Sequence, residues 1–224
     1  MCPVLAFLES LPPAEREALL AAGHSRRWEG GEPIVREGEP ATSAILVLAG
    51  LVKIHKSAAD GSELVLRLSG PGDLLGEVAA LRGAARMANA TALEPVDGVV
   101  IAVPEVRALL TRHPSLSLAL LELAVARLRI ADERRLESAT AETLPRVASR
   151  LVELAERFGT PADDGTIEVG MPITQEELAS WAAASRESTA RALRTLRELK
   201  LIETHRRRLV VLGLDRLRAH ATRL

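Results

Sequence analysis

Between residues 24 and 103, short apolar runs alternate with turn residues. The runs PIVREG, SAILVLAGLVKIHK, ELVLRLSG and GVVIAV are separated by turns that contain glycines such as Gly61, Gly72 and Gly98. Several short strands at this spacing are typical of an antiparallel sandwich or barrel. Residues 11–22 predict a short amphipathic helix with prolines at its start. We therefore expect an antiparallel β-roll or jelly-roll domain in residues 1–113.

A long helix is predicted to follow, from Pro114 to Ser138. One apolar stripe recurs at spacings of three and four, as in a coiled coil, and consists of Leu118, Leu121, Val125 and Leu128. A second apolar set, expected to pack on the β domain, consists of Leu116, Leu120, Leu123 and Ala124. A helix that is apolar on two sides needs two partners. Either a second copy of the chain covers the stripe, which would form a dimer interface, or the helix is fully buried in a monomer.

The stripe breaks at DERRLES, so we expect any contact between copies to weaken there. The segment ATAETL is predicted to be a hinge, and a further helix is expected from Pro145 to about Phe158. The polar loop GTPADDG and the strand TIEVGMPI come next. The expected fold class is α+β, with three parts: the β domain in 1–113, the long helix and hinge in 114–141, and a helical domain in 142–224.

Two short helices are predicted after this strand. The segment TQEE is a capping box, in which the hydroxyl of Thr174 and the carboxylate of Glu177 each accept from a free backbone N–H. The tight connection AAS follows, and Ser185 is placed to cap the next helix. Two short helices joined by three or four residues form a helix-turn-helix.

The second of these helices is predicted to be amphipathic. Its apolar face contains Thr189, Leu193, Leu196 and Leu199, and Glu187, Arg191 and Arg194 point almost oppositely. Such a helix fits the DNA major groove, where arginine reads guanine and glutamate accepts from cytosine. The alternative is a surface ion pair between Glu187 and Arg191.

A basic turn supports the DNA-binding alternative. The segment LIETHRRRLVVL predicts strand, turn and strand, and such a wing brings Arg206, Arg207 and Arg208 near phosphates. Residues 181–224 contain eleven Arg or Lys against four Asp or Glu, a net charge of +7, although the whole chain carries −1. A basic end on an acidic body favours a polyanionic partner such as double-stranded DNA.

Other functions find little support in the composition. The single cysteine, Cys2, excludes an internal disulfide and a multi-cysteine metal site supplied by this chain alone. No signal peptide and no stretch of about 18 uncharged apolar residues is found, so we expect a cytoplasmic protein that does not contact a membrane. The histidines are isolated, and no hydrolase, zinc-protease or P-loop motif occurs. We expect no metal and no enzymatic activity.

The segment ITQEELASWAAASRESTARALRTLRELKLIE resembles the DNA-binding half of the Crp/Fnr superfamily of bacterial transcription factors. The resemblance implies that Arg186, Glu187 and Arg191 read bases. It implies phosphate contacts from the hydroxyl and arginine residues Thr174, Ser185, Ser188, Arg194, Arg206, Arg207 and Arg208. One departure is Ala183, where the family's turn usually has glycine; an alanine with positive φ costs about 1–2 kcal/mol.

The segments PGDLLGEVAAL and ARMANATALE resemble the cyclic-nucleotide-binding β-roll of the same superfamily. The resemblance implies an effector site that comprises Gly76, Glu77, Arg86, Met87, Ala131 and Asp132. Arg86 suits a phosphate and Glu77 a ribose hydroxyl. Met87, Ala131 and Asp132 replace residues that supply hydroxyls in members that bind cAMP. Three possibilities stay open: cAMP, another small effector, or no ligand, with Gly76 and Glu77 shaping a turn and Arg86 pairing with Glu77.

The main hypothesis is a homodimeric regulator that binds a palindromic operator through a winged helix-turn-helix and acts with RNA polymerase. One alternative is an enzyme built on a cupin-like barrel, although KIHK offers a single histidine where metal ligands would cluster. The other alternative is a ligand-binding module that acts on a protein partner.

Overall fold

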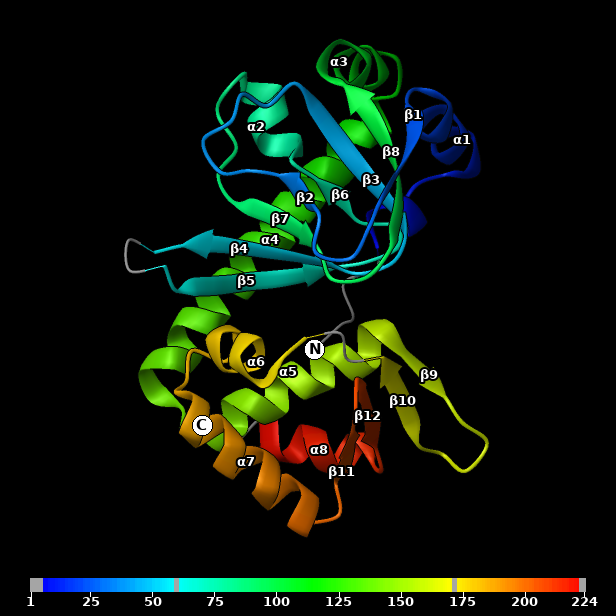
Figure 1. Ribbon diagram of the computed structural model, residues 1–224. Helices are drawn as coiled ribbons and strands as arrows, with labels where there is room; N and C mark the ends of the chain where they lie inside the picture. Colours follow the sequence, from blue (N-terminus) through cyan, green and yellow to red (C-terminus); the bar gives the residue numbers. More distant parts are fainter. Residues whose placement is uncertain (1–5, 59–60, 171–172, 222–224) are drawn as a thin grey trace. The chain divides into compact units, whose positions relative to one another are not determined.

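The computed structural model describes residues 6–58, 61–170 and 173–221 (Figure 1). The chain divides into two compact units, of which the first ends at Arg129 and the second begins at Ile130. Each unit is described by itself below. Cys2 lies outside the described residues.

Two antiparallel four-stranded sheets form the N-terminal unit (Figure 1). One sheet has the order β1-β8-β3-β6, built from His24–Trp28, Val96–Ala102, Ser43–Ala49 and Leu74–Leu75. The other has the order β2-β7-β4-β5, built from Pro33–Val35, Asn89–Ala92, Val52–Ser57 and Glu63–Ser69. The predicted antiparallel β domain is confirmed. Its strands β1 and β7 were not predicted as strands, because HSRRW and NATA lack a continuous apolar run.

Strand β3 shows why the unit has two cores. Side chains alternate between the faces of a strand, and four consecutive residues of SAILVLA are fully buried. Ala44 and Leu46 belong to one apolar cluster, with Phe7, Ile101 and Leu116. Their neighbours Ile45 and Val47 belong to a second cluster, with Trp28, Val52, Leu75 and Val96. The strand is therefore apolar on both faces, as expected for a central strand covered on each side.

Helices cover the first of these cores. The predicted helix of residues 11–22 is present as α1, Pro13–Ala21, after a 3-10 turn at Phe7–Ser10. Helix α2, Glu77–Arg82, follows β6, and α3, Val103–Arg112, follows β8. Helix α3 was not predicted from the sequence, since VPEVRALLTR begins directly at the end of an apolar strand.

Helix α4 spans Pro114–Thr140 and is longer than predicted by two residues. Leu116 and Leu123 are buried in the first core, and Leu120 packs against it, as expected. Ala124, placed in the same set from its spacing, is exposed. The contact pattern divides α4 between the two units at Arg129 and Ile130, so the predicted separate part 114–141 is shared between them.

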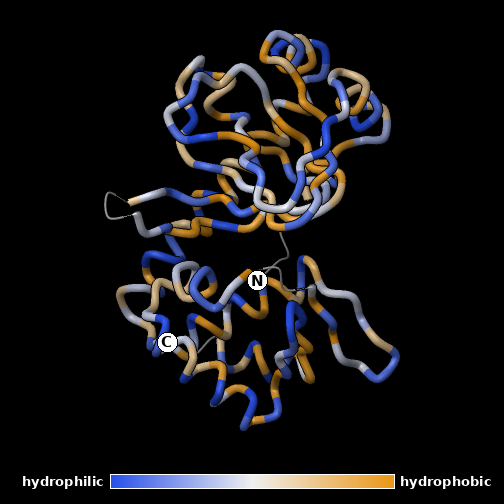
Figure 2. Tube along the Cα trace, in the orientation of Figure 1, coloured by the Kyte–Doolittle hydropathy of each residue, from blue (hydrophilic) through white to orange (hydrophobic). Residues whose placement is uncertain are grey.

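The C-terminal unit surrounds helix α5, Thr143–Phe158. A four-stranded antiparallel sheet has the order β11-β12-β10-β9, from Ile202–His205, Arg208–Val211, Ile167–Gly170 and Gly159–Pro161. The hairpin between β9 and β10 ends in hydrophilic residues (Figure 2). Helices α6, Gln175–Trp181, α7, Arg186–Glu198, and α8, Leu214–Ala221, complete the unit. Helix α8 was not predicted. Within the described ranges, the helices are too short or too polar to cross a membrane.

Candidate nucleic-acid interface

Helix α6 begins with the predicted capping box. The backbone N–H of Glu177 donates to the Thr174 hydroxyl at 3.1 Å, and the Thr174 N–H donates to the Glu177 carboxylate at 2.7 Å. Thr174 is exposed, but its own hydroxyl hydrogen is directed to Glu177 at 3.1 Å. Its predicted phosphate contact therefore requires this hydroxyl to exchange partners.

The turn between α6 and α7 is tight and strained. Ala183 has φ +50°, the left-handed conformation that favours glycine. Its N–H donates to Ser180 O at 3.1 Å, and the N–H of Ala184 reaches back to Ala179 O at 2.9 Å. These two bonds form the usual glycine-type end of a helix. Ala183 accordingly supports the same turn that glycine would make, with a steric penalty of about 1–2 kcal/mol.

Helix α7 has one buried and one exposed face. Thr189, Leu193 and Leu196 are buried, as predicted, and Ala192 joins them. Leu199, predicted on the same face, is 41% exposed, because it lies beyond the last helical residue. The opposite face consists of exposed residues, namely Arg186, Glu187, Arg191, Arg194 and Arg197.

Three side chains at the start of α7 form a chain of hydrogen bonds. Ser185 caps the helix by accepting from the N–H of Ser188 at 3.1 Å, and the two hydroxyls lie 3.0 Å apart. Arg191 donates to the Ser188 hydroxyl at 2.8 Å. In the described residues Glu187 and Arg191 do not form the ion pair that was the alternative interpretation of this face. The Arg191 guanidinium is held by a neutral acceptor that it can leave at little cost.

The wing is the hairpin of β11 and β12. His205 pairs with Arg208, so Arg206 and Arg207 form its exposed two-residue loop. Arg207 has φ +59°, which is a strained conformation for a residue with a side chain. Arg208 differs from its neighbours, since it donates to Glu168 of β10 at 3.1 Å. Its predicted phosphate contact competes with this ion pair.

Four of these arginines have neither an ion pair nor a side-chain hydrogen bond in the part of the chain that the structure describes. They are Arg186, Arg194, Arg206 and Arg207. All four lie on α7 or on the wing, and all are exposed. Exposed cations that are not neutralised by neighbouring acids leave a local positive potential, which attracts polyanions.

Among the predicted effector residues of the N-terminal unit, Arg86 is a buried cation, unlike the exposed arginines of α7 and the wing. Arg86 is only 7% exposed, and burial lowers the pKa of its guanidinium, while Glu39 and Glu77 act in the opposite direction. It donates to Gly76 O and to the Ser43 hydroxyl, both at 3.3 Å. Gly76 has φ +72°, and a Cβ there would collide with the Arg86 guanidinium. Glycine is therefore favoured by conformation, and a side chain there would also require the Arg86 guanidinium to move.

Glu77 is also buried, but it does not pair with Arg86. It forms an ion pair with Arg127 of α4, whose guanidinium also donates to Leu74 O at 2.7 Å. The predicted alternative, in which Arg86 pairs with Glu77, is therefore wrong. Arg127 was not selected from the sequence. The available signal was the spacing of Arg127, which lies four residues after Leu123 and therefore on the apolar side of the helix.

The remaining predicted effector residues are exposed. Met87 is 57% exposed. Ala131 and Asp132 are exposed residues of the C-terminal unit, and Asp132 pairs with Arg135 at 3.7 Å. A cavity of about 480 Å³ in the N-terminal unit is lined by residues that include Ala22, His24 and Ser43. None of the predicted effector residues lines it.

The predicted dimer stripe is the most exposed apolar surface of α4. Leu118, Leu121, Val125 and Leu128 are 58%, 60%, 58% and 63% exposed. Leu136, beyond the predicted stripe, is 56% exposed. The helix is therefore not fully buried within one chain, which was the alternative interpretation. Among the described residues, no three His, Cys, Asp or Glu side chains gather as metal ligands would.

Comparisons with known proteins agree with this geometry. Residues 25–113 match the model of the cyclic nucleotide-binding domain, and residues 145–220 match the Crp-like helix-turn-helix domain. A CRP-like cAMP-activated global transcriptional regulator of Mycobacterium tuberculosis is 34% identical over 73% of this chain and 72% of its own length. The cyclic AMP receptor protein of Thermus thermophilus is 31% identical over 86% of this chain and 85% of its own.

Solved structures show the same arrangement. A CRP-family transcriptional regulator of Thermus thermophilus has a TM-score of 0.71 and 30% identity, over 88% of this chain and 96% of that one. FixK2 of Bradyrhizobium japonicum has a TM-score of 0.79 over 90% of this chain and 98% of its own. At 20% identity, the second likeness concerns the fold alone.

Proposed function

The chain belongs to the Crp/Fnr superfamily of transcription regulators, and from this premise we propose that it binds a palindromic operator as a homodimer. It is a DNA-binding transcription regulator with a sensor domain of the cyclic-nucleotide-binding fold. In the proposal, α7 enters the major groove, where Arg186, Glu187 and Arg191 read base edges. The wing arginines Arg206 and Arg207 contact phosphates.

One observation carries the DNA-contact part of this proposal. In the described ranges, Arg186, Arg194, Arg206 and Arg207 lack carboxylate partners, whereas Arg208 and Arg218 are neutralised by Glu168 and Glu156. An exposed surface without a function usually places opposite charges side by side. Exposed arginines without acidic partners, grouped around one capped helix, are suited to contact the phosphates of a DNA backbone.

The stripe on α4 supports the proposed homodimer. Large apolar side chains at coiled-coil spacing and more than half exposed support pairing with a second copy of the same helix. A two-fold symmetric pair presents two recognition helices about one helical turn of DNA apart, or about 34 Å. The proposal also includes RNA polymerase as a partner, the cytoplasm as location, and no enzymatic step. Membership in a family of bacterial transcription regulators supports these three parts of the proposal.

The sensor domain is proposed to bind a small anion at Arg86. A buried guanidinium that is held by neutral acceptors is costly, and an anionic ligand would compensate it. Gly76 and Glu77 complete the wall of this site, and Arg127 fixes the carboxylate of Glu77. Because Met87 supplies no hydroxyl, we do not assign cAMP as the effector.

Selection from random duplexes tests the operator. By family resemblance the selected half-site is expected to approximate TGTGA, followed by its inverted copy. The apo protein and the protein with candidate nucleotides are compared in parallel. Recovery of a non-palindromic consensus, or of no consensus, would contradict the proposal.

A further inference from the structure

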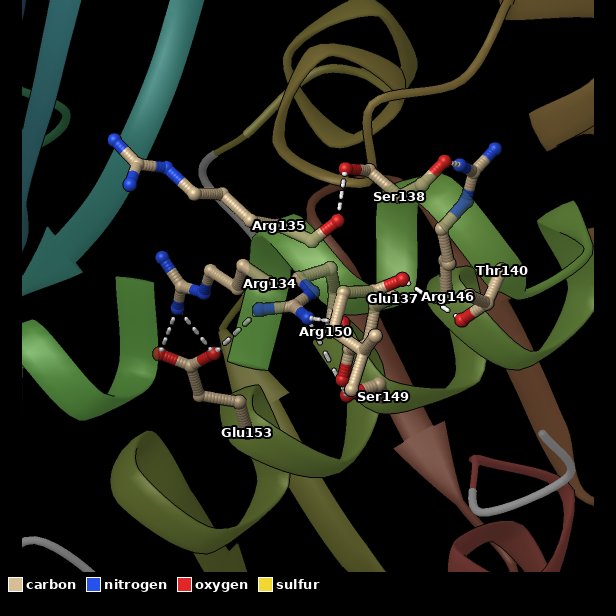
Figure 3. Close-up of polar contacts among 10 residues, drawn as sticks. Arg134, Arg135, Glu137, Ser138, Thr140, Arg146, Ser149, Arg150 and Glu153 are labelled. Atoms are coloured by element: carbon tan, nitrogen blue, oxygen red, sulfur yellow. Dashed lines mark hydrogen bonds and ion pairs between the residues drawn. The ribbon is translucent and has the colours of Figure 1, made fainter. Parts of the chain in front are cut away.

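The last turns of α4 are fixed to α5 by a buried cluster of charges (Figure 3). One guanidinium nitrogen of Arg134 donates to both carboxylate oxygens of Glu153, at 2.7 and 3.0 Å. Arg150 donates to Glu153 at 3.3 Å and also forms an ion pair with Glu137. The two arginines and two glutamates thus alternate along one connected path between the helices. We call these four residues the charge cluster.

Burial makes the charge cluster more than a surface network. The Arg150 side chain is 5% exposed, and those of Arg134, Glu153 and Glu137 are 18%, 20% and 28% exposed. Burial also lowers the pKa of Arg134, an effect that Glu153 opposes. Ion pairs at such sites are strongly favourable relative to leaving one partner alone, because a single buried charge is expensive.

The cluster also reaches the helix-turn-helix. The guanidinium groups of Arg134 and Arg150 lie 5.7 and 5.8 Å from the ring centre of Trp181, within the range of cation–π contacts. Trp181 is the last residue of α6 and directly precedes the turn to α7. Arg134 of α4 therefore contacts both α5, through Glu153, and α6, through Trp181. Helix α6 directly precedes α7, the proposed recognition helix.

Further contacts attach the same segment. Ser149 donates to Glu137 at 3.3 Å, and Arg146 donates to Ser138 O at 3.1 Å. These bonds lie around the break between α4 and α5, which consists of Ala141 and Glu142. These hydrogen bonds connect residues on the two sides of the break, where the segment ATAETL predicted a hinge.

We propose that the charge cluster makes residues 130–140 of α4 a rigid part of the DNA-binding unit. The break between α4 and α5 is then held in one conformation by the hydrogen bonds that bridge it. The charge cluster is a positioning device: it transmits the direction of α4 to α6 through Trp181.

The consequence for operator choice rests on the proposed function. If the stripe pairs two chains, the clamped segments set the separation of the two recognition helices. A dimer with this clamp should therefore discriminate sharply between operators whose half-sites differ in spacing by one base pair. A dimer without it should tolerate the change.

Hydrogen exchange on the full-length protein tests the clamp without DNA. We expect the amides of residues 133–140 to be as protected as those of α5. Glu153→Gln should lower that protection by about tenfold or more, because it leaves Arg134 and Arg150 without their shared carboxylate. The matched control is Arg135→Gln, which removes the exposed pair with Asp132 from the same segment and should leave protection unchanged.

The test does not depend on dimer formation. In Leu121→Glu/Val125→Glu, the segment 133–140 should stay protected while 116–128 exchanges faster. Rapid exchange of 133–140 in the wild type, or equal effects of the Glu153 and Arg135 changes, would overturn the proposal. If Glu153→Gln does not fold, Arg134→Met removes the guanidinium and all donation to Glu153 while it keeps much of the side-chain volume. Unchanged protection in that variant would also overturn it.

Operator spacing gives the functional arm. We expect one inserted base pair to weaken wild-type binding by about tenfold, and Glu153→Gln to reduce this penalty while half-site binding is retained. A variant in which the amides of residues 133–140 exchange rapidly, but in which an inserted base pair weakens binding as much as in the wild type, would refute the positioning role. Failure of all chains to bind any operator would instead contradict the proposed function, and exchange would still decide the clamp.

Discussion

Two regions of this molecule, the surface of α7 and the wing and the interior of the sensor domain, place their arginines in different environments. On α7 and the wing, Arg186, Arg194 and Arg207 are exposed and lack carboxylate partners among the described residues. In the sensor domain, Arg86 is buried, and its two hydrogen bonds go to neutral acceptors. Neither set of arginines forms an ion pair among the described residues, although Glu39 and Glu77 stabilise the charge of Arg86 without pairing with it.

The difference indicates the size of the anion that each unit can accept. An exposed set of cations spread over a helix and a hairpin suits a large polyanion, whose affinity comes from many weak contacts. A single enclosed guanidinium beside Gly76 suits one small anion, whose affinity comes from a few strong bonds in a dry site. Changes at each site test this contrast.

Separating the two copies should weaken operator binding most. Leu121→Glu with Val125→Glu places four like charges in the proposed helix pair, so we expect monomers in light scattering. Loss of the second half-site contact should reduce operator affinity by about 100- to 10,000-fold. A double variant that stays dimeric would show that α4 is not the interface.

The sensor site should distinguish its anion from cAMP. Met87, Ala131 and Asp132 replace hydroxyl residues, and each lost hydrogen bond weakens binding by about 0.5–3 kcal/mol. We expect cAMP to bind about two to four decades more weakly than in a site with all three hydroxyls. Calorimetry at protein concentrations on the order of tens of micromolar measures this. Saturable binding tighter than about 10 µM, abolished by Arg86→Ala, would be the contrary result.

Arg191→Ala removes a proposed base contact. We expect a loss of about 1–3 kcal/mol per half-site and relaxed base choice at one operator position. Competition between the selected operator and single-base variants gives both quantities. A loss that is equal for all sequences would mean that Arg191 contacts phosphate.

The wing allows a matched pair of changes. Arg207→Ala should weaken all sequences similarly and lower the magnitude of the salt slope by about 1 per site. Arg208→Ala should have a smaller effect, because its guanidinium is engaged by Glu168, in an exposed ion pair worth about 0–1 kcal/mol. Equal effects on the slope would show that Arg208 leaves Glu168 for DNA.

The turn before α7 gives the smallest effect. Ala183→Gly should stabilise the protein by about 1 kcal/mol, because glycine adopts the left-handed conformation without a Cβ penalty. Ala184→Gly is the control, since its φ is not positive and glycine there only adds flexibility. Chemical denaturation compares the two. Destabilisation by Ala183→Gly would show that Ala183 makes a favourable contact.

Local signals explain why the DNA-binding helices could be predicted from the sequence. The capping box at Thr174 and the cap at Ser185 depend on residues three positions apart, and both are present as expected. The wing likewise depends on a short hairpin, in which His205 pairs with Arg208. The positive φ of Ala183 was also foreseeable from the position of the turn.

The sensor site and the charge cluster depend on distant residues. Glu77 and Arg127 are fifty positions apart, so the sequence did not indicate that this pair would replace one between Glu77 and Arg86. Glu153 and Arg134 lie on different helices, and the polar residues of DERRLES predicted only the end of an apolar stripe. Leu199 was misplaced because helical spacing was extended past the end of α7.

The free cations on α7 and the wing are proposed to bind duplex DNA specifically. Fluorescence anisotropy tests this with the selected palindrome and a scrambled duplex, each titrated over a range of potassium chloride concentrations. We predict that log affinity for the palindrome falls linearly with log salt, with a slope steeper than about −4, and that the scrambled duplex binds at least about a thousandfold more weakly. Equal affinity for both duplexes, or affinity that does not change with salt, would contradict the account.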